Sequence, residues 1–183
     1  MQVSYSSDGP GMKNIMEGIA ALNGADALVG IPESNTGRKE GDIGNAALLF
    51  IFTNGSPLHG QPPRPVIEPA IEQPDTAERI SRALATASTA ALDGNEAGMI
   101  DALDRAGQIG ESAAKAWFTD SRNGWAENAA STIRAKGSDT PGIDTSQMRR
   151  AITHVVETGQ GVHAGNAANF APDAEIAEMA EVV

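Results

Sequence analysis

The sequence predicts an α+β protein in which several helices pack on a small mixed or antiparallel sheet, followed by a C-terminal extension. Two observations favour this class. Apolar residues recur every three or four positions over 11–22 and 76–136, whereas 25–31 and 151–157 alternate with a period of two. The chain also holds only two Trp, one Tyr and four Phe. Its core must therefore use small and aliphatic side chains at short range, and a neighbouring subunit often completes so thin a core.

The N-terminal region predicts a strand, a helix and a second strand. Residues 2–5, "QVSY", predict a short strand. An amphipathic helix follows from Gly11, and Asn23-Gly24 supplies its stop. Residues 25–31 then predict a strand, which Pro32 ends. The apolar face of the helix consists of Met12, Ile15, Met16, Ile19 and Leu22.

Residues 32–44, "PESNTGRKEGDIG", predict a long exposed loop. The segment is polar and Gly-rich, and Arg38 and Lys39 add positive charge. Loops of this length in compact domains are usually functional or disordered, and we expect this one to reach an adjacent subunit. The apolar run 45–54 follows, with Asn45 as the expected capping residue and Gly55 as the stop. We interpret it as a buried helix in preference to a buried strand.

The segment 55–74 holds six of the ten prolines. Each proline fixes its own φ and biases the preceding residue to an extended conformation, so "QPPRP" predicts a stiff corner. Pro63 and Pro65 flank Arg64, whose guanidinium would bind a carboxylate on a neighbouring subunit or cap a nearby carbonyl. The alternative is an intrachain corner that only directs the next helix. The sequence leaves both interpretations open.

Three helices are expected after the proline segment. Asp75 and Glu78 resemble a capping box at the start of the first, which Gly94 terminates. The second begins at Asn95 and carries an Ala/Gly-rich seam that would let another helix approach closely. The third lies within 126–136 and ends at Gly137.

The C-terminal part of the expected domain holds a helical turn at 145–150 and a strand at 151–157, with His154 on the inner face of the strand. We place the domain boundary at 157. Residues 158–183 are interpreted as a linker and an appended acidic tail. The tail residues Phe170, Ile176 and Met179 would dock outside their own domain.

Composition excludes several classes of protein. The net charge of −11 argues against nucleic-acid or anionic-lipid binding as the main activity, because a phosphate binder needs clustered Lys and Arg. Without cysteine there is no disulfide, thiolate nucleophile or Cys-ligated zinc. No apolar run is long enough to span a bilayer, and the N-terminus lacks a secretory pattern. We therefore expect a soluble, unsecreted protein.

The sequence offers no catalytic, cofactor-binding or metal-binding motif. His59, His154 and His163 lie far apart in the chain, and neither a phosphate-binding loop nor a nucleophile elbow occurs. We interpret His154 as a hydrogen-bonded structural residue. Acidic pairs, such as Asp101 with Asp104 and Glu175 with Glu178, are interpreted as solvated helix faces.

The densest basic cluster is also given a structural interpretation. It contains Arg149 and Arg150, together with Arg134 and Lys136. In so acidic a chain, a helix-end cap or a subunit salt bridge is favoured over phosphate binding.

Two stretches resemble a known family. Residues 45–72, "NAALLFIFTNGSPLHGQPPRPVIEPAIE", resemble the segment of tailed-bacteriophage virion morphogenesis proteins that carries an apolar helix, a Gly-Ser/Thr-Pro turn, a Pro-x-Arg-Pro corner and a helix start. Residues 131–157 resemble the C-terminal pattern of the same family. The resemblance covers roughly 25–157. Phe52-Thr53 stand where the family often has His-Glu, Ser146 where Gly is common, and His154 where Tyr is frequent.

The resemblance implies a non-enzymatic subunit of the neck or tail-completion layer of a virion, assembled as a ring where the tail joins the head. The implied partners are copies of the chain itself, often six, and the adjacent connector and tail-tube proteins. DNA would only pass through, repelled by a negative lumen, and neither a membrane nor a cofactor is implied. Alternatives are a head-side connector or stopper, an assembly chaperone, and a hydrolase or metal- or ligand-binding domain.

Overall fold

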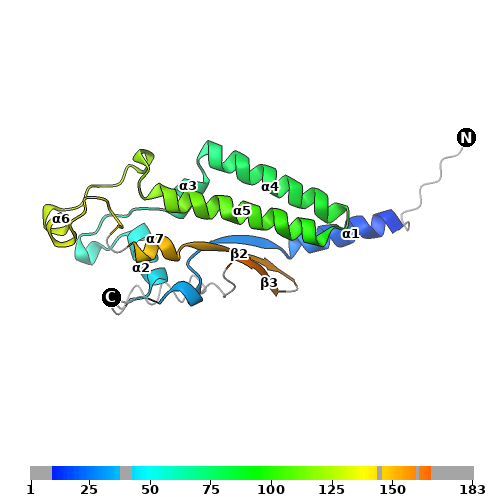
Figure 1. Ribbon diagram of the computed structural model, residues 1–183, viewed down its shortest axis with the longest axis horizontal. Coiled ribbons are helices and arrows are strands. Elements are labelled where there is room, and N and C mark those ends of the chain that lie inside the picture. Colours follow the sequence, from blue (N-terminus) through cyan, green and yellow to red (C-terminus); the bar gives the residue numbers. More distant parts are fainter. Residues whose placement is uncertain (1–9, 38–42, 144–145, 160, 166–183) are drawn as a thin grey trace, which may run out of the picture.

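A computed structural model describes residues 10–37, 43–143, 146–159 and 161–165, and it shows an α+β fold. The molecule is elongated, with helix α1 (Pro10–Asn23) at one end and helix α6 (Ala130–Lys136) at the other (Figure 1). The predicted helix at the N-terminus is confirmed as α1. The predicted strand at 2–5 lies outside the described residues.

The sheet is antiparallel and has the order β1-β2-β3. Strand β1 (Asp26–Gly30) pairs with β2 (Thr153–Thr158), which brings Leu28 opposite Val155 and confirms the two strands predicted at 25–31 and 151–157. Strand β3 (Gly161–Gly165) then pairs with β2.

The prediction of a linker from residue 158 onward is wrong for 161–165. Thr158 pairs with Gly161, and Gly161 adopts φ 127°, a conformation that a side chain disfavours. Glycine-rich composition suits a tight hairpin as well as a linker, and composition alone does not separate them. The folded domain therefore extends beyond the boundary predicted at 157.

Two long helices form the spine of the molecule. Helix α4 (Pro74–Leu92) packs along α5 (Glu96–Trp117), and α5 also packs on β1 and β2, so it lies between α4 and the sheet (Figure 1). A Cβ added at Gly107 would lie 2.6 Å from His154 Cδ2, and one at Gly110 would lie 2.9 Å from Val29 Cγ2. The predicted close approach of another helix to the Ala/Gly-rich seam is confirmed, because Met99 and Leu103 pack with Ala87 and Ala91 of α4. The contact of the same seam with the sheet was not predicted.

The remaining short helices gather at the end of the spine where α5 terminates. Helix α2 (Asn45–Asn54) packs against α7 (Gln147–Ala151), and α3 (Ile67–Ile71) packs on α5. Three 3₁₀ turns link these pieces, at Glu33–Asn35, Pro57–His59 and Ser121–Asn123. The buried helix and the helical turn predicted for α2 and α7 are both confirmed.

Two helix starts differ from prediction. Asn45 does not cap α2: its side chain is buried and donates to the carbonyls of Asn35 and Gly37, while Thr36 Oγ1 accepts from the backbone N–H of Ala46. These bonds tie the two ends of the predicted 32–44 loop together. The capping box at Asp75 is also absent, because α4 begins at Pro74, whose missing N–H needs no cap.

The buried residues form two clusters with different side chains. The aromatic core lies where α2, α3, α7 and the end of α5 meet, and the alanine core lies between α4, the start of α5 and β2. The aromatic core consists of Ile31, Leu49, Phe52, Val66, Ala114, Phe118, Met148, Ala151 and Ile152. The alanine core consists of Ala87, Ala91, Met99, Ala102, Leu103 and Val156.

Candidate functional site

A buried polar network joins α5 to the sheet around His154. The side chain is 7% exposed, with Nδ1 2.5 Å from Glu111 Oε2 and Nε2 3.0 Å from Asp104 Oδ1. Gly107 lies between these two carboxylates on α5 and makes room for the ring. The prediction that His154 is hydrogen-bonded on the inner face of its strand is therefore confirmed.

Glu111 is the centre of this network. It accepts hydrogen bonds from Lys115 Nζ at 2.7 Å and from Thr153 Oγ1 at 3.3 Å, in addition to its contact with His154. Burial by itself would raise the pKa of Glu111, but the hydrogen bonds and charges of Lys115 and His154 outweigh burial and lower that pKa. The carboxylate thus stays ionised and holds β2 against α5.

Sequence reasoning missed the acidic partners of His154. We had interpreted Asp104 as part of a solvated face, yet its side chain is 25% exposed and contacts the histidine. The signal that could have found the pair is the spacing of Asp104, Gly107 and Glu111. Steps of three and four residues place two carboxylates on one helix face with a gap between them.

Arg64 folds back into its own chain. The residue is 6% exposed, and its Nη2 donates to the carbonyl of Ala126 at 2.8 Å, while its Cζ lies 5.7 Å from the ring centroid of Phe52. Burial lowers the pKa of its guanidinium from the ordinary value. For Arg64, the structure therefore agrees with the predictions of a carbonyl cap and an intrachain corner. It disagrees with the prediction that Arg64 binds a carboxylate on a neighbouring subunit, because the residue is buried in its own chain. Pro63 and Pro65 remain exposed beside it.

Three residues of the predicted basic cluster, Lys136, Arg149 and Arg150, also bind backbone carbonyls. Arg149 Nε donates to the carbonyl of Lys115 in the last turn of α5 at 2.7 Å, and Lys136 Nζ donates to that of Thr140 at 2.7 Å. Arg150 Nε contacts the carbonyl of Ser146 at 3.3 Å. Capping of this kind is favourable because the C-terminal end of a helix carries partial negative charge. The helix-end interpretation of this cluster is therefore confirmed for Arg149.

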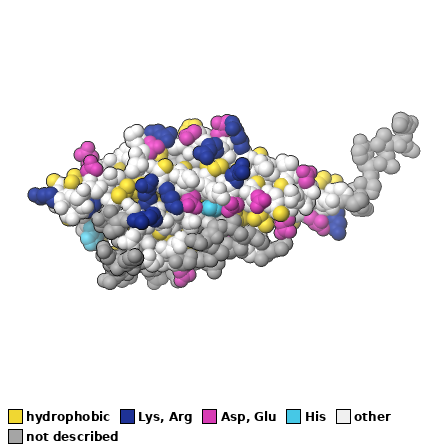
Figure 2. Space-filling view, in the orientation of Figure 1, with side chains coloured by type: hydrophobic (Ala, Val, Ile, Leu, Met, Phe, Trp, Pro, Cys, Tyr) yellow, Lys and Arg dark blue, Asp and Glu magenta, His cyan; other side chains and the backbone are white. Residues whose placement is uncertain are grey.

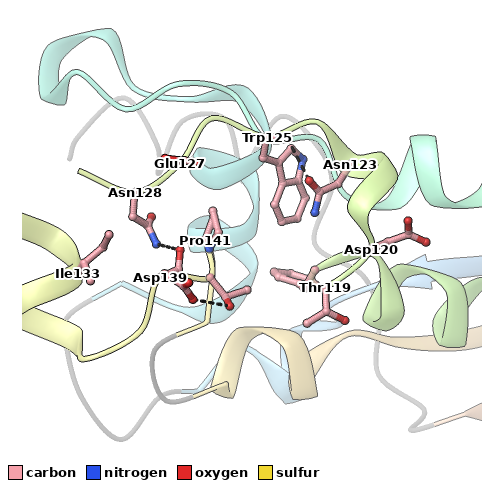
Figure 3. A pocket seen from close by; sticks show the side chains of 11 residues that line it. Thr119, Asp120, Asn123, Trp125, Glu127, Asn128, Ile133, Asp139 and Pro141 are labelled. Carbon is pink, nitrogen blue, oxygen red and sulfur yellow. Dashed lines mark hydrogen bonds between the residues drawn. The ribbon is translucent and has the colours of Figure 1, made fainter. Parts of the chain in front are cut away.

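An open pocket of about 510 Å³ lies between the end of α5 and α6 (Figure 3). Trp125 and Phe118 provide its apolar wall, and several polar side chains around it bind their neighbours. Asn128 Nδ2 donates to the carbonyl of Asp139 at 2.7 Å. Asp120 is paired with Arg122, whose hydrogen bonds lower the pKa of Asp120 to about 2. The pocket residues thus mainly hold the surrounding loops together.

The clearest candidate for contact with another molecule is an exposed apolar face on α1, here named the α1 stripe. Gly18 contacts α4, where a Cβ would lie 2.4 Å from the carbonyl oxygen of Ala91. Although α1 approaches α4 this closely at Gly18, most of the predicted apolar face of α1 is exposed. The members of the stripe are 42–59% exposed, and they are Met12, Ile15, Met16 and Ile19.

Several predicted interaction residues lie outside the described residues. These are Arg38 and Lys39 in the loop, and Phe170, Ile176 and Met179 in the tail. Within the part of the chain that the structure describes, no group of three His, Asp or Glu side chains could hold a metal ion. No described helix has both the length and the apolar character needed to cross a membrane. Comparison with protein-family models, curated proteins and solved structures gave no match.

Proposed function

We propose that this protein is a structural subunit of a tailed-phage virion, in the tail-completion or tail-terminator ring that joins the tail to the head. The α1 stripe is the observation that carries the assembly part of this proposal. Four large apolar side chains on consecutive turns of one helix are left open by the described chain, and such patches favour contact with another protein surface.

The two stretches that resemble the phage family support the proposal of that family. They are separated by the α4–α5 hairpin in the sequence, yet they meet in the aromatic core. Leu49 and Val66 come from the first stretch, and Met148 and Ile152 come from the second. Residues that recur together in one family are expected to pack together, and these do. The resemblance therefore describes one folded unit made of two distant segments.

The α1 stripe is too small to hold a ring together by itself. Full burial of one large apolar side chain contributes about 1.5–3 kcal/mol, so burial of four half-exposed side chains contributes roughly 3–6 kcal/mol. Association costs about 4–15 kcal/mol in lost translational and rotational freedom. A stable ring therefore needs further contacts besides the stripe.

Self-association of the purified full-length chain tests the assembly part. We expect rings in negative-stain images and a multimeric mass in analytical ultracentrifugation. The variant Ile15→Gln/Met16→Gln should shift the mass to that of a monomer without unfolding. Leu58→Gln is the matched control, because Leu58 is 91% exposed on a different surface and its replacement should leave the ring intact. A wild-type chain that stays monomeric up to millimolar concentration would contradict the proposal.

Deletion of the gene in the phage tests whether the protein belongs to the tail-completion ring or to a head-side ring. Tails of uncontrolled length, or full heads without joined tails, are expected for a tail-completion subunit. Heads that leak DNA would instead indicate a head-side connector or stopper. Absence of the protein from purified virions by mass spectrometry would indicate an assembly chaperone. A catalytic turnover that depends on one buried acidic or imidazole group would overturn the structural role.

A further inference from the structure

A groove between α4 and α5 carries positive charge in a strongly acidic chain. Its rim holds Arg79 and Arg82 from α4 and Arg105 from α5, and its floor holds Ala83 and Ile109. The open volume of the groove is about 520 Å³. Lys and Arg side chains gather over α4 and α5 on the face that Figure 2 shows.

Two of the three arginines are unused by the described fold. Arg82 forms an ion pair with Glu78, one helical turn earlier on the same helix. The guanidinium groups of Arg79 and Arg105 make no hydrogen bond or salt bridge with any described residue. Two neighbouring unpaired guanidinium groups over a small apolar floor favour an occupant that is acidic on one side and apolar on the other.

The C-terminal segment 173–183, "DAEIAEMAEVV", has this chemistry. Ile176, Met179 and Val183 are spaced by three and four residues, which places them on one face of a helix. Glu175 and Glu178 fall beside that face. Its acidic groups match the rim arginines, and its apolar face matches the floor formed by Ala83 and Ile109.

The dimensions of the two partners agree. The groove follows α4 from Arg79 to Thr86, which is about 10 Å at 1.5 Å per residue, or two helical turns. Ile176 to Val183 covers the same two turns. Residues 166–172 separate this segment from β3, and when extended they span about 23 Å, enough to leave the domain and reach a neighbour.

We infer that the C-terminal segment 173–183 of one copy binds the α4–α5 groove of a neighbouring copy. The sheet and α4 lie on opposite sides of α5, and the described chain ends on the sheet side at β3 (Figure 1). The last described residues therefore lie on the opposite side of α5 from α4. The contact adds charge complementarity to the apolar burial of the α1 stripe, and it rests on the self-assembly proposed above.

A charge-exchange experiment on full-length chains tests this contact. One variant reverses the groove, Arg79→Glu/Arg105→Glu, and another reverses the tail, Glu175→Lys/Glu178→Lys. Each should weaken self-association about tenfold at low salt, because two favourable pairs become repulsive. Arg134→Glu is the matched control, since Arg134 is exposed on α6 outside the groove and should leave association unchanged. Circular dichroism and thermal melts establish that each variant is folded.

Mixing separates contact between copies from contact within one chain. In an equimolar mixture, the unchanged tail of the groove variant meets the unchanged groove of the tail variant, so assembly should return to near the wild-type level in ultracentrifugation. Failure of the mixture, with normal assembly when both reversals are in the same chain, would mean that the tail binds its own groove and would overturn the inference.

Other outcomes separate a failure of the tail–groove contact from a failure of the proposed function. Loss of assembly in the groove variant but not in the tail variant would assign the groove to another occupant. If wild type assembles and both variants assemble equally well, only this contact fails. If the wild-type chain never assembles, the proposed function fails as well.

Discussion

The aromatic core and the alanine core form opposite ends of the molecule and are built differently. At the aromatic end, Phe52 and Phe118 stack at 5.9 Å between ring centroids, and Trp125 packs edge-on against both. At the alanine end, Ala87, Ala91 and Ala102 allow helices to approach closely but bury little surface. At the aromatic end Phe52 and Phe118 are buried by the described chain, whereas the alanine end leaves the α1 stripe exposed. The thin core thus lies at the end best suited to contact with a neighbour.

Among tests of this contrast, Phe118→Ala should have the largest effect on stability. Phe118 is almost completely buried between the other two aromatic rings, and its truncation should lower the free energy of unfolding by about 3–5 kcal/mol. Urea denaturation measures the loss. Leu58→Ala should change the same quantity by less than about 0.5 kcal/mol, because Leu58 contributes no buried surface. A loss below about 1 kcal/mol for Phe118→Ala would show that the aromatic end is not the more strongly packed one.

Gly18→Ala tests the alanine end and should have the next largest effect. The new methyl group would collide with the carbonyl of Ala91, so α1 must move away from α4 at a cost of about 1–3 kcal/mol. We expect faster amide hydrogen exchange in α1, with protection in the centre of α5 unchanged. Gly11→Ala is the matched control on the same helix. Its Cβ meets no atom within 4 Å, so this change should stabilise α1. Equal exchange in both variants would contradict the close α1–α4 contact.

Glu111→Gln tests the polar network around His154, which joins α5 to β2 between the two cores. The loss of charge-assisted hydrogen bonds should cost on the order of 1 kcal/mol at neutral pH. Because the folded-state pKa of Glu111 lies below its ordinary value of 4.5, its ionisation stabilises the fold above about pH 4.5, and this contribution is lost as the pH falls through the folded-state pKa.

The measurement for Glu111→Gln is the melting temperature across this acid range. Wild type should lose more stability on acidification than the variant does. Asp101→Asn, a change at an exposed position on the same helix, should follow the wild-type profile. Parallel profiles for wild type and Glu111→Gln would contradict an ionised Glu111 in the fold.

Ser146→Gly should have the smallest effect and is expected to stabilise the aromatic end. Ser146 has φ 60°, the one positive φ among the described residues that are not glycine. A left-handed conformation costs a non-glycine residue about 1–2 kcal/mol, and glycine gives back part of that as unfolded-state entropy. The net gain should be about 0.5–1 kcal/mol in urea denaturation. Ser146→Ala, which keeps the Cβ, should bring no such gain. The resemblance is consistent with this geometry, since the family commonly has Gly there.

Local patterns predicted much of the secondary structure. The stop signals at Gly55, Gly94 and Gly137 were correct, because each glycine takes a positive φ that ends a helix. Asn95 was correctly expected at the start of α5, where its Oδ1 accepts from the N–H of Gly98. These features depend on residues within one or two turns of one another. Strand β3 was not predicted, because its glycines suit a hairpin and a linker equally well.

The sequence by itself determined the α+β class, most helix ends, the stiff proline corner and the charge of the chain, since periodicity and backbone preference act over a few residues. Only the tertiary structure decided which faces are buried. Gly18, placed close to Ala91, leaves the α1 stripe open, and Gly107 admits His154 between two carboxylates. Arg64 turns to a carbonyl 62 residues away. Each of these depends on contacts between distant segments, whose distances no local pattern encodes.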